Sequence, residues 1–248
     1  MRLGIVTALA AGFAVCALPA VAAPAKVAFV GDSMSDGIWG AFFRMTGNNK
    51  CSDELTLIRD ARNGTGLARP DHFDWNAELD SLVGKEAPSL VFASIGLNDE
   101  QDLVVMPDKT KYHLGTSEWL NQYKRNVADF YEHAGKGGAP VMIVGLPNLR
   151  DTSAEKHAEL VNGIYADVAK SETAVSVTYV EPWRLTNDDG GFASFGLNLN
   201  GQTVQLRAPD GLHFTQAGYD VLARYLEPSL SKALATAHVT LPDTCLGG

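Results

Sequence analysis

Five short apolar runs, separated by longer segments with helical periodicity, constrain the fold of this chain more than any other feature of its sequence. They lie at 26–30, 55–60, 90–95, 141–144 and 175–180, and most are apolar throughout rather than at alternate residues. Continuous apolar runs are typical of parallel strands that are covered on both faces. The pattern therefore predicts a five-stranded, mainly parallel sheet.

The segments between these runs carry apolar residues at helical spacing. Trp119, Tyr123 and Val127, for example, fall on one face of a helix. We expect helices at 34–45, 75–83, 117–134, 154–170 and 216–235. This order predicts an α/β protein with three layers, helix, sheet and helix. Ligands of such proteins bind beyond the carboxyl ends of the strands.

Two connections are longer than a compact domain usually needs. Residues 100–116 contain no clear element, whereas Asn200-Gly201 joins two strand-like runs within 186–208. Asn-Gly between such runs predicts a hairpin with a type I′ turn, here a small insertion near 192–206. Long loops often serve as lids or binding loops. We expect both segments to lie over a functional site.

The first 22 residues have the features of a secretory signal peptide. Arg2 precedes an apolar run at 3–18, and Ala20-Val21-Ala22 matches the small-residue cleavage pattern. We expect cleavage after Ala22, with Ala23 as the alternative, export to the periplasm or the medium, and a single domain formed by residues 23–248. No later segment is apolar enough to insert stably into a membrane.

The charge of the chain argues against two classes of partner. Its formal net charge is −9, and the Lys and Arg residues are scattered. Nucleic acids and anionic membranes attract clustered positive charge, so we expect neither as a partner.

Cys51 and Cys245 are the two cysteines outside the signal sequence. In an exported protein a lone pair of cysteines usually forms a disulfide, and we expect one here; two free thiols are the alternative. The separation is not a zinc-ligand spacing.

Polar clusters follow or lie near the ends of the expected strands. Ser33 comes directly after the first strand, where a turn serine would be unremarkable by itself. The four clusters are Gly31-Asp32-Ser33, Asn63-Gly64-Thr65-Gly66, Gly96-Leu97-Asn98-Asp99 and Asp210-Gly211-Leu212-His213. The expected fold brings such connections to one edge of the sheet. We therefore expect them to converge.

Together the clusters contain the parts of a serine hydrolase. A serine hydroxyl is a weak nucleophile and needs a neighbouring base, which His213 can supply for Ser33. Asp210, three residues before the histidine, can orient the imidazole and stabilise its charged form. We predict Ser33, His213 and Asp210 as catalytic residues.

Acyl transfer also needs hydrogen-bond donors where the oxyanion forms. The backbone N–H of Ser33, the side-chain amide of Asn98 and the N–H of a glycine after the second strand are the candidates. We favour Gly66 for that glycine, with Gly64 as the alternative.

The ordered motifs "GDS", "NGTG", "GLND" and "DGLH" resemble those of the SGNH (GDSL) hydrolases, and they spread over essentially the whole chain after the signal sequence. The resemblance implies a flavodoxin-like three-layer α/β/α fold and ester hydrolysis. The phrases "TGLARPDHFDW" and "LRAPDGLHFTQAGYDVLA" are similar to an exported bacterial branch, related to carbohydrate and peptidoglycan O-acetylesterases and to polysaccharide O-acetyltransferases.

Further residues within or beside these motifs are candidate substrate contacts: Asp32, Gly64, Arg69 and Arg207. His72 lies between Asp71 and Asp74, but one histidine with carboxylates is more typical of a polar loop than of a metal site. We expect no metal and no cofactor.

The sequence thus favours an exported serine esterase that removes short acyl groups, acetyl above all, from a cell-envelope or extracellular glycan. A polysaccharide O-acyltransferase with the same site remains an alternative, as does a short-chain lipase or lysophospholipase. A non-catalytic glycan-binding module is the third alternative, against which the intact Ser33, Asp210 and His213 argue.

Overall fold

The computed structural model describes residues 23–246 of the chain, so the predicted signal peptide and its cleavage site lie outside the described residues. Among the residues described, none of the helices combines the length and the apolar character that a bilayer span needs.

A five-stranded, fully parallel sheet forms the centre of the molecule, as the apolar runs predicted. Its strands are β1 (Ala25–Gly31), β2 (Leu55–Ala61), β3 (Leu90–Ser94), β6 (Val141–Val144) and β7 (Val177–Val180), in the order β2-β1-β3-β6-β7. In the register of β1 with its neighbours, Gly31 pairs with both Ala61 and Ser94. The ends of three strands therefore lie at one level of the sheet, and the loops that follow them emerge side by side.

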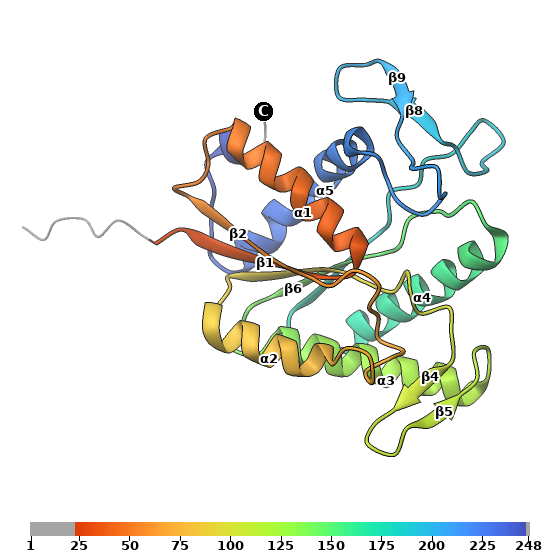
Figure 1. Ribbon diagram of the computed structural model, residues 1–248. Helices are drawn as coiled ribbons and strands as arrows, with labels where there is room; N and C mark the ends of the chain where they lie inside the picture. The colour runs from red at the N-terminus through yellow and green to blue at the C-terminus, as the bar shows by residue number, and fades with distance from the viewer. Residues whose placement is uncertain (1–22, 247–248) are drawn as a thin grey trace, which may run out of the picture.

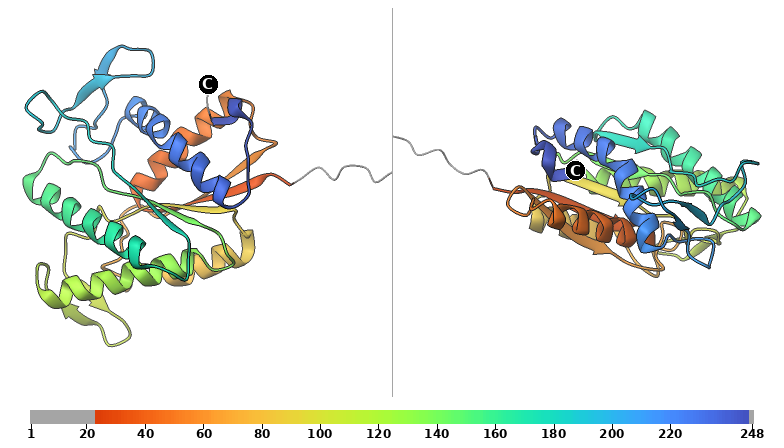
Figure 2. Two further views of the ribbon diagram at one scale, coloured as in Figure 1. Left: turned by 180° about the vertical axis from the view of Figure 1, so that it is seen from behind. Right: turned by 90° about the horizontal axis from the view of Figure 1, so that it is seen from above.

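Helices cover both faces of this sheet, which confirms the expected three layers (Figure 1 and Figure 2). The helices are α1 (Ser33–Asn48), α2 (Trp75–Glu86), α3 (Ser117–Ala134), α4 (Thr152–Ser171), α5 (Gln216–Thr236) and the short α6 (Asp243–Leu246). Helices α1 and α5 pack on one face, and α2, α3 and α4 on the other.

Strand β1 shows why the apolar runs lack alternation. Val27 and Phe29 face the core under α1 and α5, whereas Ala28 and Val30 face the core under α2, α3 and α4. All four side chains are fully buried. A strand in this position needs an apolar residue at every step, because water reaches neither face.

The structure contains a disulfide between Cys51 and Cys245, whose Cα atoms lie 5.1 Å apart across a sequence separation of 194 residues. Both cysteines are buried. The Asn49 side chain donates a hydrogen bond of 3.1 Å to the carbonyl of Cys245. The bridge thus fastens α6 and the C-terminal segment to the loop that follows α1.

The two long connections each contain an antiparallel hairpin, and both hairpins extend from the side of the molecule where the strands end (Figure 1). The hairpin β4 (Leu103–Val105) and β5 (Thr110–Tyr112) lies in a connection for which we expected no clear element. The hairpin β8 (Phe195–Leu197) and β9 (Thr203–Gln205) was predicted.

The type I′ turn predicted for the second hairpin is wrong. Gly201 has a positive φ of 75°, whereas Asn200 is not among the residues with positive φ that a type I′ turn would require. The Asn198 side chain sets the loop instead, since its Oδ1 accepts hydrogen bonds from the backbone N–H groups of Asn200 and Gln202.

Candidate active site

Ser33 lies at the junction between β1 and α1. Gly31, the last residue of β1, has a φ of 126°, and a Cβ there would lie 2.1 Å from the carbonyl oxygen of Ser94. Asp32 then caps α1 and Ser33 is its first residue. Among residues 23–246, no acceptor is found for the backbone N–H of Ser33. This N–H, at the positive end of the helix, is available to an anion.

Three side chains form a hydrogen-bonded chain at this junction. Ser33 Oγ lies 2.6 Å from His213 Nε2, and His213 Nδ1 lies 2.8 Å from Asp210 Oδ2. The second carboxylate oxygen of Asp210 accepts hydrogen bonds from the backbone N–H groups of Leu212 and His213. The same carboxylate therefore shapes the turn and orients the imidazole.

Asp210 stays ionised in this arrangement. Burial alone would raise the pKa of its carboxyl, but the hydrogen bonds from the His213 ring and from the backbone N–H groups of Leu212 and His213 outweigh this effect and lower the pKa to about 2. A permanent negative charge next to Nδ1 favours the imidazolium that forms when Nε2 takes a proton.

Asn98 follows β3 and is half-buried beside the loop after β2. Its Nδ2 donates a hydrogen bond of 2.8 Å to the carbonyl of Thr65, which leaves the second amide hydrogen free to donate. The backbone N–H of Gly66 also has no acceptor within the described part of the chain. The structure thus leaves donors available on Ser33, Asn98 and Gly66.

Asp99, the residue after Asn98, fixes this loop in place. It is fully buried, and its two oxygens accept hydrogen bonds from the backbone N–H groups of Leu67 and Ala68, both at 2.9 Å. The hydroxyl of Tyr123 donates a third, at 2.7 Å. Asp99 therefore ties the loop after β2 to the turn that carries Asn98.

Asp32 does not contact substrate, contrary to our prediction, because it is fully buried. Its carboxylate accepts hydrogen bonds from the N–H groups of Met34, Gly96 and Leu97, at 2.9 to 3.0 Å. Burial raises the pKa of Asp32 to about 7, although the backbone N–H groups oppose the shift. Asp32 is a structural residue that joins the start of α1 to the turn before Asn98.

Arg207 is also buried rather than available to substrate, so that prediction is wrong as well. Its guanidinium donates hydrogen bonds to the carbonyls of Asn148 at 2.6 Å, Leu212 at 2.8 Å and His213 at 3.3 Å. It also lies over the ring of Phe214. Burial lowers the pKa of Arg207 to about 10, so the group stays protonated at neutral pH.

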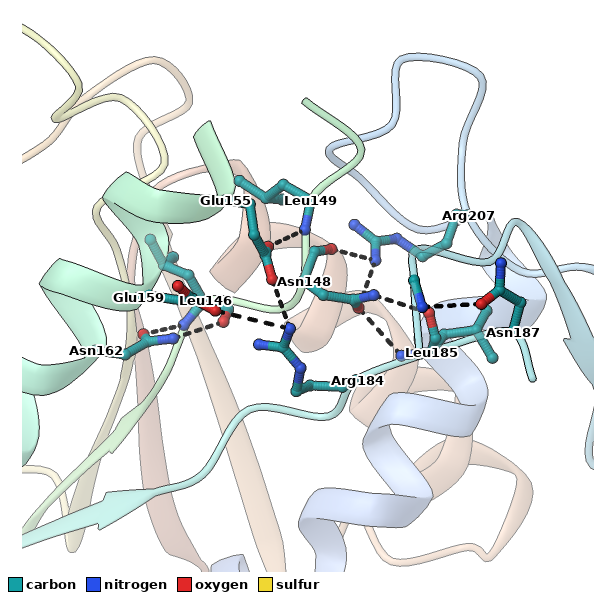
Figure 3. A network of polar contacts seen from close by, with 11 residues as sticks. Leu146, Asn148, Leu149, Glu155, Glu159, Asn162, Arg184, Leu185, Asn187 and Arg207 are labelled. Carbon is teal, nitrogen blue, oxygen red and sulfur yellow. Dashed lines mark hydrogen bonds and ion pairs between the residues drawn. The ribbon is translucent and has the colours of Figure 1, made fainter. Parts of the chain in front are cut away.

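Figure 3 shows how the contact between Arg207 and Asn148 forms part of a larger network of hydrogen bonds. The side chain of Asn148 donates to the carbonyl of Leu185 and accepts from its N–H, while the Asn148 carbonyl receives Arg207. The segment after β6, the segment after β7 and the His213 loop are therefore held by one network. Arg207 positions His213 from below rather than contacting a ligand.

The remaining predicted contacts lie near the edge of the site. Arg69 is partly buried and forms an ion pair with Asp71 at 2.8 Å, and it also donates to Gln101. Gly64 is exposed and has a φ of 79°. His72 contacts Arg69.

Comparison with known proteins supports the same fold. Residues 26–229 match the model of a family described as "Protein of unknown function (DUF459)". No curated protein matches the sequence significantly.

Several solved structures are similar. A carbohydrate esterase family 3 protein from Talaromyces cellulolyticus has a TM-score of 0.58 and 12% identity, covering 86% of this chain and 99% of its own. TesA has a TM-score of 0.54 and 20% identity, with coverage of 84% and 99%. A GDSL-like lipase from Bacteroides thetaiotaomicron has a TM-score of 0.52 and 16% identity, with coverage of 86% and 88%. At these identities the likeness shows a shared fold.

Proposed function

Since the chain belongs to the DUF459 family and has the fold of the SGNH (GDSL) hydrolases, we propose that it is a serine esterase that removes short acyl groups from a glycan. The observation that carries this proposal is the continuous hydrogen-bonded chain from Ser33 through His213 to Asp210, with Ser33 at the first position of a helix.

The proposed reaction begins with attack of Ser33 Oγ on the ester carbonyl. His213 Nε2 takes the hydroxyl proton as the Oγ–carbon bond forms. The carbonyl oxygen becomes an oxyanion and receives hydrogen bonds from the N–H of Ser33, the free amide hydrogen of Asn98 and the N–H of Gly66. These donors are held in place before substrate arrives, and such preorganisation is usually the largest contribution to the rate.

The tetrahedral intermediate then collapses. His213 returns its proton to the alkoxide of the leaving alcohol, and the acyl group stays on Ser33. Water next attacks this acyl-enzyme while His213 accepts one of its protons. The second collapse releases the carboxylic acid and restores the Ser33 hydroxyl, so that atoms and protons balance over the cycle.

Two observations support a short acyl group on a glycan, and a third supports export. The connection that leads to Asp210 contains "TNDDGG" and "NLNGQ", which are polar and suit a sugar better than a fatty chain. One structural neighbour is a carbohydrate esterase, and another is described as an acetyl xylan esterase. The disulfide, together with the signal-like N-terminus, supports export, because disulfides persist in oxidising compartments.

The proposal is tested with the purified protein and p-nitrophenyl esters from acetate to octanoate, beside O-acetylated glycans. We expect kcat/KM to be highest for acetyl and at least about tenfold lower for octanoyl, which corresponds to about 1.4 kcal/mol of transition-state binding. A steady rise toward octanoyl would favour a lipase or lysophospholipase. Acyl transfer to an added acceptor sugar in preference to water would favour the acyltransferase.

Ser33→Ala should abolish hydrolysis while circular dichroism shows a folded protein, because nucleophiles that act within a triad account for most of the rate. Ser81→Ala is the matched control, since Ser81 is an exposed residue of helix α2 and lies outside the candidate site. Near-normal turnover in folded Ser33→Ala protein would contradict the proposal.

A further inference from the structure

A row of buried polar groups runs from Asp99 into the hydrophobic core. Asp99 Oδ2 lies 2.7 Å from the hydroxyl oxygen of Tyr123, which lies 3.1 Å from that of Tyr165. The Tyr165 hydroxyl lies 3.0 Å from the carbonyl oxygen of Ile95. All four residues are fully buried, and we call them the Asp99 chain. Because Tyr123 belongs to α3 and Tyr165 to α4, the Asp99 chain ties both helices to the turn that carries Asn98.

The number of protons in the Asp99 chain decides which of its contacts are hydrogen bonds. Each of the three oxygen–oxygen contacts needs one proton. Burial raises the pKa of the Tyr123 and Tyr165 hydroxyls well above the usual value, so each hydroxyl keeps its single proton. A carbonyl oxygen and an ionised carboxylate contribute none. With an ionised Asp99, the chain therefore has two protons for three contacts.

Neither arrangement of two protons satisfies the Asp99 chain. Tyr123 then donates to the carboxylate of Asp99, and the proton of Tyr165 decides the rest. If Tyr165 donates to Ile95, two hydroxyl oxygens face each other at 3.1 Å with no proton between them. If Tyr165 donates to Tyr123, the buried Ile95 carbonyl loses the one donor found for it among residues 23–246. A buried acceptor without a donor destabilises the fold, and such groups are rare.

We propose that Asp99 is protonated and uncharged in the folded protein at neutral pH, and that it donates to Tyr123, which donates in turn to Tyr165. Tyr165 then donates to Ile95, so that three protons fill three contacts. The direction of the bond between Asp99 and Tyr123 is the reverse of that with an ionised carboxylate. The protonated acid still accepts the two backbone N–H groups, because its hydroxyl oxygen keeps lone pairs.

The surroundings of Asp99 favour the uncharged form. Complete burial raises the pKa of its carboxyl, although the backbone N–H groups of Leu67 and Ala68 oppose the shift. Asp32, a second buried carboxyl, lies close enough to repel a charge on Asp99. His157 is nearby but supplies no cation, since burial lowers the pKa of its imidazole. These neighbours therefore leave a buried negative charge on Asp99 without a compensating cation.

The uncharged state gives Asp99 a role in the proposed esterase reaction, on which that role rests. Asp99 Oδ1 packs against Gly66, one of the proposed oxyanion donors. A carboxylate at this place would repel the negative charge that develops on the ester carbonyl oxygen. The uncharged acid holds the donor loop through the N–H groups of Leu67 and Ala68 without this repulsion. Asp99 is therefore a positioning residue.

Infrared spectroscopy at neutral pH tests the protonation state directly, because a protonated carboxyl has a C=O stretching band apart from those of carboxylates and amides. We expect this acid band in the wild-type minus Asp99→Asn difference spectrum, from which the unchanged Asp32 cancels. Asp129→Asn, at an exposed position of α3, is the matched control and should change carboxylate bands alone. A carboxylate band for Asp99 would overturn the inference.

Tyr123→Phe provides the same test without altering Asp99. The variant removes the group that accepts the acid proton, so the acid band of the wild-type protein should move. An acid band at the same position in both proteins would mean that Asp99 does not donate to Tyr123, and would overturn the inference.

The pH dependence of unfolding is an independent measurement. The folded pKa of Asp99 is raised above its ordinary value of 3.8, so its contribution to stability is complete below that pH and is lost as the pH rises. From about pH 5 to 7, unfolding of the wild type releases a proton that Asp99→Asn lacks. The ratio of the wild-type to the Asp99→Asn unfolding constant should therefore rise about tenfold per pH unit. A constant ratio would overturn the inference.

Neither measurement depends on hydrolysis, which separates this inference from the proposed function. If wild-type protein hydrolyses no ester yet shows the acid band of Asp99, the proposed function fails and the protonated Asp99 stands. Ester hydrolysis by a protein whose Asp99 is ionised would overturn this inference alone.

Discussion

The carboxylate of Asp99 occupies the space that a side chain at Gly66 would need: a Cβ on residue 66 would lie 2.1 Å from Asp99 Oδ1. Glycine at this position is therefore explained by a neighbouring carboxylate that must reach the backbone of Leu67 and Ala68. The candidate site depends on this close contact between Gly66 and Asp99. The loop that Asp99 holds also carries Thr65, whose carbonyl accepts the hydrogen bond from the Asn98 side chain.

Gly66→Ala should accordingly displace Asp99 and disturb the loop. We expect kcat to fall at least about tenfold and the free energy of unfolding to fall by about 1–3 kcal/mol, the usual range for overpacking a well-packed site. Gly84→Ala is the matched control, because a Cβ there meets nothing within 4 Å and the residue lies in α2. The control should stabilise the protein slightly. Urea denaturation and p-nitrophenyl acetate hydrolysis measure both effects.

Asn98→Ala should lower kcat by about 10²–10³, as expected for removal of one oxyanion donor, with a smaller effect on KM. The control is Asn126→Ala, since Asn126 Nδ2 donates to the Leu67 carbonyl at 2.7 Å and so holds the same loop from α3. Each substitution should cost about 1 kcal/mol of stability through its lost hydrogen bond. Equal kcat values for the two variants would mean that Asn98 acts only on the loop.

Arg207→Lys should reduce kcat more than KM, because a lysine cannot reach the Asn148, Leu212 and His213 carbonyls together. We expect stability to fall by about 2–4 kcal/mol, since buried acceptors lose their partners. Arg59→Lys is the control: Arg59 pairs with Asp36 at the surface and should tolerate the change within about 1 kcal/mol. An Arg207→Lys protein with normal kcat would contradict the positioning role.

The pH dependence of stability should reveal the low pKa of Asp210. Its folded value of about 2 lies below the ordinary value of 3.8, so its ionised form stabilises the native state. That contribution is complete above the ordinary value and is lost as pH falls toward 2. Below about pH 5 the stability difference between wild type and Asp210→Asn should therefore shrink as the pH falls from about 4 toward 2. A difference that stays unchanged between about pH 5 and pH 2 would contradict this assignment.

Reduction of the Cys51–Cys245 bridge should destabilise the protein without abolishing hydrolysis, because neither cysteine lies near Ser33 in the chain or in the hydrogen-bonded site. The chain-entropy model gives an upper value of about 5 kcal/mol for so long a loop. Denaturation with and without a reductant, together with a free-thiol assay, measures it. Two reactive thiols in unreduced protein would contradict the bridge.

The fold was predictable because its signals are local. Continuous apolar runs located all five strands, and α3 was expected with the bounds that it has, Ser117–Ala134. The β4–β5 hairpin escaped because each strand has only three residues, LVV and TKY, which is too short for a periodicity to show.

The residues that support the site were harder to recognise than those that form it. The residues predicted to form the site lie within short motifs that can be read directly from the sequence: Ser33, Asn98, Asp210 and His213. The role of Asp32 and Arg207 depends on burial, and an aspartate or arginine beside a motif looks the same in sequence whether it faces substrate or carbonyl groups. The partnership of Gly66 with Asp99 joins residues 33 positions apart, which no local pattern reveals.

Asp32 also has a consequence for how the site opens. Its carboxylate holds the N–H groups of Gly96 and Leu97 while its own residue caps the helix that begins at Ser33. The serine and the Asn98 turn therefore cannot separate by local fluctuation without exposing a buried carboxylate. In hydrogen–deuterium exchange, the amides of Met34, Gly96 and Leu97 should show the same protection factor, because their hydrogen bonds to Asp32 break in one opening event. The candidate site is then either fully assembled or fully lost.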